Sequence, residues 1–167
     1  LPASQSDKVD SLRKYIEKMQ AKTTLHSEIF PYTRGNKDNI LIIGDIHAPF
    51  NLESYLAFCR TQQEKFKCGK VVFIGDLIDN HYSSYHETDP DGLSAGDELD
   101  LAISQIQKYY KVFPEAEVII GNHDRLVYRK AFSSGVSKRW IKEYKEVLGT
   151  PNWNFVENVE VYGVNIN

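Results

Sequence analysis

Three short apolar runs set the predicted architecture of the chain. They cover residues 40–47, 70–74 and 117–120, and β-branched residues dominate them. Between them, apolar residues recur at intervals of three and four over residues 52–65 and 97–111, which predicts two helices. A strand, a helix and a further strand in this order predict right-handed βαβ units with parallel strands. The pattern therefore predicts an α/β fold built on a parallel sheet.

The amino-terminal part of the chain has a different pattern. Residues 7–22 show helical spacing of apolar side chains, and Asp7 is placed to cap this helix. We expect the helix to dock on its own domain or to pair with a second copy, giving a homo-oligomer. The following polar residues are expected to form a loop. We therefore divide the chain into an amino-terminal extension, 1–37, and a domain, 38–167.

The segments around and after the central strands are less regular. Residues 80–96 are too rich in turn-forming residues for a helix or strand, and a loop of this length often has a function. Residues 124–148 predict one or two helices, with a break near Ser133–Gly135 and a basic face that we interpret as solvated. Residues 153–155 and 160–166 are predicted strands. The apolar side of the 52–65 helix is expected to include Leu52, Tyr55, Leu56, Cys59 and Phe66.

Composition narrows the classes of function only a little. The chain has 167 residues, a net charge of −3 and a pI near 6.0, so it has no overall basic character that would indicate nucleic-acid binding. The overall charge does not exclude a local basic patch. The sequence contains no apolar run of the ~20 residues that a membrane span needs, and we expect a cytoplasmic protein. Its two cysteines, Cys59 and Cys68, are expected to be buried or half-buried thiols rather than a disulfide or a metal site.

Each apolar run is followed by polar residues that can bind a metal. Asp45 and His47 come after the first, Asp76 after the second, and Asn122 and His123 after the third. If residues 40–47 are extended, Asp45 and His47 point to the same side. The carboxyl ends of adjacent parallel strands also meet at one edge of the sheet. Carboxylate, amide and imidazole ligands suit Mn²⁺, Mg²⁺, Fe or Zn²⁺, and a bridging carboxylate would allow a two-metal site for phosphoester hydrolysis.

The three polar clusters resemble the motifs of the calcineurin-like metallophosphoesterase superfamily. They read Gly-Asp-Ile-His at 44–47, Gly-Asp-Leu-Ile-Asp-Asn at 75–80 and Gly-Asn-His-Asp at 121–124, in the family's order. The run from 75 to 99 is most similar to phage and bacterial members. The resemblance implies an α/β/β/α sandwich, of which this chain would supply the first βαβαβ half and one or two further strands.

The resemblance also implies a role for each polar residue. Metal ligands would be Asp45, His47, Asp76 as the bridge, and Asn122, which would also bind the phosphate. His123 would contact the substrate and protonate the leaving oxygen as a general acid, with Asp79 holding its imidazole. Asp124 would support the same loop, although capping of the following helix explains it equally well. The implied cofactors are two divalent ions, with Mn²⁺ favoured and Mg²⁺, Fe, Zn²⁺ or Ni²⁺ as alternatives.

Two departures from the family pattern shape the expectation about function. Protein phosphatases of the superfamily carry an arginine where this chain has Asn80, followed by His81, so a phosphoprotein substrate is disfavoured. His81 or His86 is a weak candidate for the phosphate contact that the arginine would make, and Asn80 is a further candidate substrate-binding residue. No histidine follows His123, and the Gly-His-x-His motif of the family is absent. We therefore expect a truncated chain, or one whose carboxyl-terminal half is a separate chain.

Two functions follow from these observations. The first is a metal-dependent phosphoesterase, a phosphodiesterase or phosphatase, that hydrolyses a nucleic acid or nucleotide with a two-metal-activated water. The alternative is a catalytically inactive fragment or degenerate domain that serves as a binding or assembly module.

Overall fold

The computed structural model describes residue 14 and residues 36–84, 92–161 and 163–166. The predicted helix over residues 7–22, and any contact between copies through it, lies outside these residues except for Lys14, which is helical. Among the helices that are described, none has the length and apolarity needed to cross a membrane.

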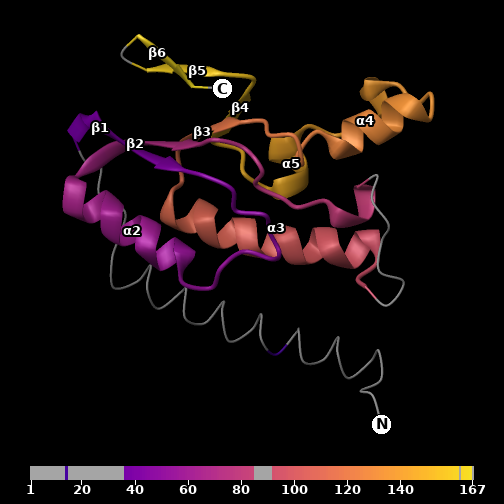
Figure 1. The fold of residues 1–167 in the computed structure, drawn as a ribbon, viewed down its shortest axis with the longest axis horizontal. Coiled ribbons are helices and arrows are strands. Elements are labelled where there is room, and N and C mark those ends of the chain that lie inside the picture. The colour runs from indigo at the N-terminus through magenta and orange to yellow at the C-terminus, as the bar shows by residue number, and fades with distance from the viewer. Residues whose placement is uncertain (1–13, 15–35, 85–91, 162, 167) are drawn as a thin grey trace.

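A four-stranded parallel sheet forms the centre of the fold (Figure 1). Its strands lie in chain order, β1 (Asn36–Ile43), β2 (Cys68–Phe73), β3 (Ala116–Ile119) and β4 (Trp153–Val156). The connections contain α2 (Tyr55–Phe66), η1 (His81–Ser83), α3 (Ala95–Val112), α4 (Leu126–Ser133), η2 (Lys138–Trp140) and α5 (Tyr144–Leu148). A hairpin of β5 (Val159–Val161) and β6 (Val164–Ile166) follows. The predicted parallel α/β fold is confirmed.

The two faces of the sheet pack against different partners. On one face, Val71 and Phe73 of β2 join a core with residues of α2, α3 and α5. On the other, Val72 packs with Ile119 and Val159, so the β5–β6 hairpin covers this face (Figure 1). The switch of side at each residue of β2 follows from the two-residue period of a strand. All three helices of the larger core therefore lie on the same side of the sheet.

Several element boundaries differ from those predicted. β1 begins at Asn36, inside the expected loop, and ends at Ile43, so the polar residues at its end lie outside the strand. Helix α2 ends at Phe66, before Gly69, and the left-handed backbone of the next residue, Lys67 (φ 52°), caps it. The predicted 160–166 strand is a hairpin that turns at Gly163, where φ is 77°.

The apolar side predicted for α2 is only partly correct. Cys59 is buried and free, as is Cys68, which confirms the expectation for the two thiols. Leu52, however, is 70% exposed and Phe66 is 54% exposed. Helical spacing placed both on the apolar side, but Leu52 precedes the helix and Phe66 is its last residue, where the helix no longer covers the sheet.

A buried lysine on α3 gives a testable effect of pH on stability. Lys108 is 4% exposed and donates to Gln105 Oε1 at 2.9 Å, and burial lowers the pKa of its ammonium group to about 8. The folded state therefore binds fewer protons than the unfolded state between about pH 8 and 10.5, and this group adds stability as the pH rises through that range. Below pH 8 the buried charge costs free energy.

Replacing Lys108 with methionine removes this cost. We expect Lys108→Met to raise the free energy of unfolding at pH 7 by about 3 kcal/mol, since the pKa falls from 10.5 to about 8 and one pKa unit corresponds to about 1.4 kcal/mol. The gain over the unaltered chain should disappear by pH 10.5. Urea denaturation at pH 7 and pH 10 measures this difference, and Lys65→Met, an exposed change on α2, is the control. A destabilised Lys108→Met chain at pH 7 would show that the lysine is held by favourable contacts instead.

Candidate metal centre

The loops that follow β1 and β2 lie side by side. The backbone N–H of His47 donates to the carbonyl oxygen of Asp76 at 2.9 Å, and that of Ala48 donates to Leu77 at 2.9 Å. In return, the N–H of Asp79 donates to the carbonyl oxygen of Ala48 at 2.9 Å. These hydrogen bonds continue the pairing of the two strands beyond their ends, so the first and second polar clusters are held in register.

Two glycines bring the loop after β3 against the loop after β2. A Cβ atom at Gly121 would lie 2.2 Å from Asp76 Oδ1 and 2.3 Å from the Asp76 nitrogen. A Cβ atom at Gly75, where φ is 103°, would lie 2.8 Å from the Cα of Gly121. No side chain fits at either position. The glycine that opens the second and third motifs is therefore required by this close approach.

Four polar residues of the first two loops have left-handed backbones. The φ angles are 40° at Asp45, 48° at His47, 51° at Asp76 and 50° at Asn80. This conformation is uncommon for residues other than glycine, although Asp, Asn and His adopt it more readily than most. The prediction that Asp45 and His47 share one side of an extended strand is wrong, because both lie beyond the strand in turn conformations. Ile46 between them is buried, as a core residue should be.

One residue from each loop meets in a cluster that could hold a metal ion. The ligand atoms of His47, Asp76 and His123 all lie within 4.8 Å of one another, and each residue is half-buried. The imidazole rings of His47 and His123 are 4.6 Å apart at an angle of 79°. Asp76 Oδ1 also accepts a hydrogen bond from the His123 backbone at 2.9 Å. Two imidazoles and a carboxylate form a donor set that suits Zn²⁺, Mn²⁺ or Fe.

The side chain of Asp79 contacts both histidines. Its Oδ1 accepts from His47 Nδ1 at 2.8 Å and lies 3.6 Å from His123 Nδ1. The His123 Nδ1 is instead within 2.7 Å of the Asp79 backbone oxygen, which can only accept a hydrogen bond. Asp79 was expected to hold His123; it does so through its backbone, while its carboxylate makes its shorter contact with His47.

These contacts assign the hydrogen on each ring. Because a carboxylate and a carbonyl oxygen both accept, Nδ1 carries the hydrogen in His47 and in His123. The Nε2 atom of each ring is then left for a metal or a substrate. An imidazole held by a carboxylate at one nitrogen is the usual arrangement for a metal-binding histidine. The cluster therefore fits a divalent ion by its chemistry as well as by its spacing.

Asp124 is a support for the loops and not a helix cap. It is 4% exposed, and its carboxylate accepts from the backbone N–H of Gly121 at 2.9 Å and of Ile78 at 3.3 Å. Helix α4 begins later, at Leu126, without a side-chain cap from its preceding residue. Burial raises the pKa of the Asp124 carboxyl to about 6, against the lowering effect of its two hydrogen bonds. Of the two readings left open by the sequence, loop support agrees with this geometry.

The other predicted site residues lie around the cluster. Asp45 and Asn122 are exposed, and the carboxylate of Asp45 is not among the three grouped side chains. The amide of Asn80 donates to the carbonyl oxygen of His123 at 3.0 Å, so this amide positions the third loop. His81 is exposed in η1. The roles predicted for these four residues stay predictions.

Sequence reasoning missed one carboxylate near the site. Glu98 of α3 is 5% exposed, and its two oxygens accept from the backbone N–H groups of His81 at 2.6 Å and Tyr82 at 3.1 Å. It fixes the start of η1, directly after the second motif. An acidic residue in the first turn of a helix is common on helix-dipole grounds alone, so the sequence carries no signal for this contact.

Comparison with known proteins gives one match. A family model described as calcineurin-like phosphoesterase matches residues 39–167. Neither the curated proteins nor the solved structures contain a match to the chain. The matched region includes all three loops of the cluster.

Proposed function

We propose, from the premise that the chain belongs to the calcineurin-like phosphoesterase family, that it hydrolyses phosphoester bonds of a nucleic acid or nucleotide with the help of bound divalent metal. The observation that supports this most strongly is the meeting of His47, Asp76 and His123 from three successive strand-end loops. Each of these residues belongs to a different sequence motif.

Metal would be held first by His47 and Asp76, with Asp45 and Asn122 as the further ligands that the family resemblance implies. When bound, divalent ions polarise the oxygens of a phosphoryl group and lower the pKa of water, which provides a nucleophile near neutral pH. The backbone around these ligands is fixed by the hydrogen bonds between the first two loops. Little rearrangement is then needed before substrate binds.

His123 would supply the proton for the leaving group. Its Nδ1 hydrogen is directed at the backbone oxygen of Asp79, so Nε2 is the nitrogen that can face a substrate. A protonated imidazole at this position can give its Nε2 proton to the oxygen that departs from phosphorus. Asp79 and Asn80 would act as positioning residues, because each contacts His123 through its backbone or side chain.

Hydrolysis of bis(p-nitrophenyl) phosphate tests this proposal. The chain should require Mn²⁺ for turnover and lose it on chelation with EDTA. His123→Ala should lower kcat/KM by roughly 10²- to 10⁴-fold, the range for loss of a general acid. The loss should be larger with a phenyl ester than with a p-nitrophenyl ester, because the poorer leaving group needs the proton more.

The matched control is Lys111→Ala, an exposed change on α3 that should leave the rate unchanged. Melting temperature with and without Mn²⁺ shows whether each variant folds and binds metal. Equal rates for His123→Ala and the unaltered chain would refute the proton-transfer role. Turnover that persists in EDTA would refute the metal-dependent reaction itself.

A further inference from the structure

The segment between the third motif and β4 concentrates positive charge. We call residues 125–145 the basic arm; it contains seven Lys and Arg residues and one Glu, a net charge of +6. The whole chain has a net charge of −3, so the remaining residues together carry −9. The arm comprises α4, η2 and the start of α5 (Figure 1). This local basic patch was invisible in the overall charge.

Large aromatic side chains are exposed on the same arm. Trp140 is 85% exposed and Phe132 is 74% exposed, whereas Leu126 is the only buried residue of α4. Lys138 and Arg139, which directly precede Trp140, are exposed as well. An isolated exposed apolar residue needs no explanation, but a tryptophan and a phenylalanine among lysines and arginines form a recurrent pattern of strand-binding surfaces.

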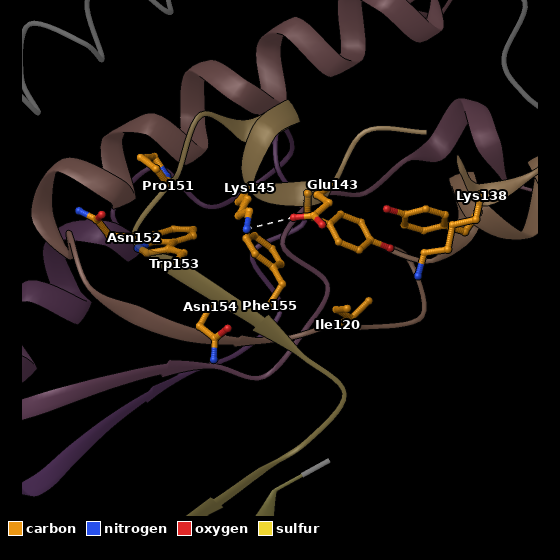
Figure 2. A pocket seen from close by; sticks show the side chains of 11 residues that line it. Ile120, Lys138, Glu143, Lys145, Pro151, Asn152, Trp153, Asn154 and Phe155 are labelled. Atoms are coloured by element: carbon orange, nitrogen blue, oxygen red, sulfur yellow. Dashed lines mark ion pairs between the residues drawn. The ribbon is translucent and has the colours of Figure 1, made fainter. Parts of the chain in front are cut away.

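Two open cavities, of about 410 and 490 Å³, lie beside the arm. Both are lined by Ile120, Tyr128, Lys138 and Tyr144. Figure 2 shows the first cavity, with Lys138 and Phe155 among its labelled lining residues. The rings of Tyr144 and Phe155, which both line it, are stacked 5.4 Å apart. Lys138 Nζ lies 5.1 Å from the centre of the Tyr128 ring. Aromatic rings and a lysine ammonium therefore line the same cavity, and these are the two kinds of group that contact bases and phosphates in single-strand binding.

The arm is attached directly to the loop of the third motif. The hydroxyl of Tyr144 donates to the carbonyl oxygen of Asp124 at 3.0 Å. The guanidinium of Arg125 donates to the carbonyl oxygen of Ile120, through Nη2 at 3.1 Å, and its ion pair with Glu157 ties it to the segment after β4. Ile120 immediately precedes Gly121, Asn122 and His123. A polymeric ligand that lies along the arm would therefore reach the metal cluster.

We infer that the basic arm binds single-stranded nucleic acid and leads it to the metal cluster, with bases stacked on Trp140 and Phe132 and phosphates against Lys138, Arg139 and Lys142. This inference rests on the proposed function, whose substrate class it narrows to a polynucleotide strand. The contacts are to base faces and phosphates, which every nucleotide offers, so binding is expected to depend little on sequence.

Two other occupants fit the arm less well. A second copy of the chain in a two-fold dimer would bring the same patch against itself, and two surfaces of charge +6 repel each other. An anionic lipid surface would attract the arm and its exposed aromatics. A lipid surface, however, would not account for the cavities lined by Tyr128 and Tyr144 or for the adjoining metal cluster.

Trp140 provides its own reporter for the test. The chain has two tryptophans, and Trp153 is 1% exposed, so quenching by a stacked base reports on Trp140. Titration of the chain with a 20-nucleotide oligothymidylate in EDTA, where no turnover occurs, should quench the fluorescence. Anisotropy of a labelled strand should give an affinity that falls roughly tenfold in Trp140→Ala, the loss of about one stacked base.

Salt dependence tests the phosphate contacts. The slope of log K against log salt concentration should become shallower by about 1.4 when Lys138 and Arg139 are both replaced by alanine, since each phosphate contact to a single strand contributes about 0.7. The matched control is Lys65→Ala with Phe66→Ala, an exposed lysine–aromatic pair on α2 in which Lys65 Nζ lies 5.2 Å from the centre of the Phe66 ring. This control should bind like the unaltered chain.

Several outcomes would overturn the inference. The first is an affinity of Trp140→Ala for the oligonucleotide equal to that of the unaltered chain, and the second is a loss of affinity in the α2 control as large as that in the arm variants. The third is binding to vesicles containing phosphatidylserine but not to the oligonucleotide, and the fourth is self-association that Trp140→Ala abolishes. Because the titration is done without metal, it is independent of hydrolysis. Failure of the small-substrate assay would refute the proposed function and leave strand binding standing, whereas the reverse result would refute strand binding alone.

Discussion

Asp76→Asn is expected to remove Mn²⁺-dependent phosphodiesterase activity while leaving the chain folded. The asparagine has nearly the same shape, and its Oδ1 can still accept the 2.9 Å hydrogen bond from the His123 backbone. What is lost is the negative charge at the centre of the His47–Asp76–His123 cluster. An amide binds a divalent cation far less well than a carboxylate, because it has no net charge and only one oxygen.

The expected size of this effect has a lower bound. Substitution of a residue that only supports a metal ligand typically lowers metal affinity or activity by about 10- to 100-fold. Substitution of a direct ligand should therefore lower activity by more than about 100-fold. Activity at several Mn²⁺ concentrations and the rise in melting temperature on adding Mn²⁺ measure it. Asp100→Asn, an exposed change on α3, is the control. Full activity in Asp76→Asn would show that the cluster is not the site of reaction.

Gly121→Ala is the second change with a large expected effect. The added methyl group would lie 2.2 Å from Asp76 Oδ1 and 2.3 Å from the Asp76 backbone nitrogen. The nitrogen belongs to the backbone of a tightly hydrogen-bonded loop, so the two loops must separate. Overpacking of this kind costs about 1–3 kcal/mol of stability, and here it also displaces the metal-binding carboxylate. We expect hydrolysis to fall at least as far as in Asp76→Asn.

Gly96→Ala is a matched control for this substitution. Its nearest neighbour would be Ser94 Oγ at 4.0 Å, and it lies in the first turn of α3. Alanine is the better helix former, so this variant should be as stable as the unaltered chain or more stable by up to about 1 kcal/mol. Chemical denaturation and the hydrolysis assay measure both glycine variants. If Gly121→Ala kept normal stability and activity, the close packing of the two loops would be wrong.

The sheet and the meeting of the three motifs were predictable from the sequence. Apolar runs followed by Asp45, Asp76 and His123 alternate with helical patterns, and the rules for parallel strands then fix which ends adjoin. Ile46 shows the strength of this reasoning, because its burial follows from its apolar side chain between two polar residues. Local pattern and chain connectivity together were sufficient for these features.

The detailed geometry of the site was not predictable in the same way. The left-handed backbone of His47 depends on its hydrogen bond to the Asp76 carbonyl oxygen, a partner 29 residues away that no local pattern reveals. Likewise, the role of Asp124 was ambiguous until Ile78, 46 residues earlier, was placed against its carboxylate. Asp79 contacts His47 through its carboxylate and His123 through its backbone oxygen, and these two contacts require all three loops to come together.

Surface features were the least predictable from pattern alone. The basic face of residues 124–148 was interpreted as a solvated surface, and its lysines are indeed exposed. Helical spacing could not show that Trp140 and Phe132 are both exposed, because Trp140 lies in a short 3₁₀ turn after the break that follows α4. The position of this turn beside Tyr128 is set by tertiary contacts.

The central claim is that His47 and Asp76 bind a divalent metal ion beside His123, and pulsed electron paramagnetic resonance of the Mn²⁺-loaded chain tests it most directly. With ¹⁵N-labelled histidine, the spectrum should show nitrogen coupling from imidazole. The coupling should vanish in His47→Ala and persist in His123→Ala, because His47 is the proposed imidazole ligand and His123 the proposed proton donor. Saturable Mn²⁺ binding without any ¹⁵N coupling, or no saturable binding at all, would contradict the claim.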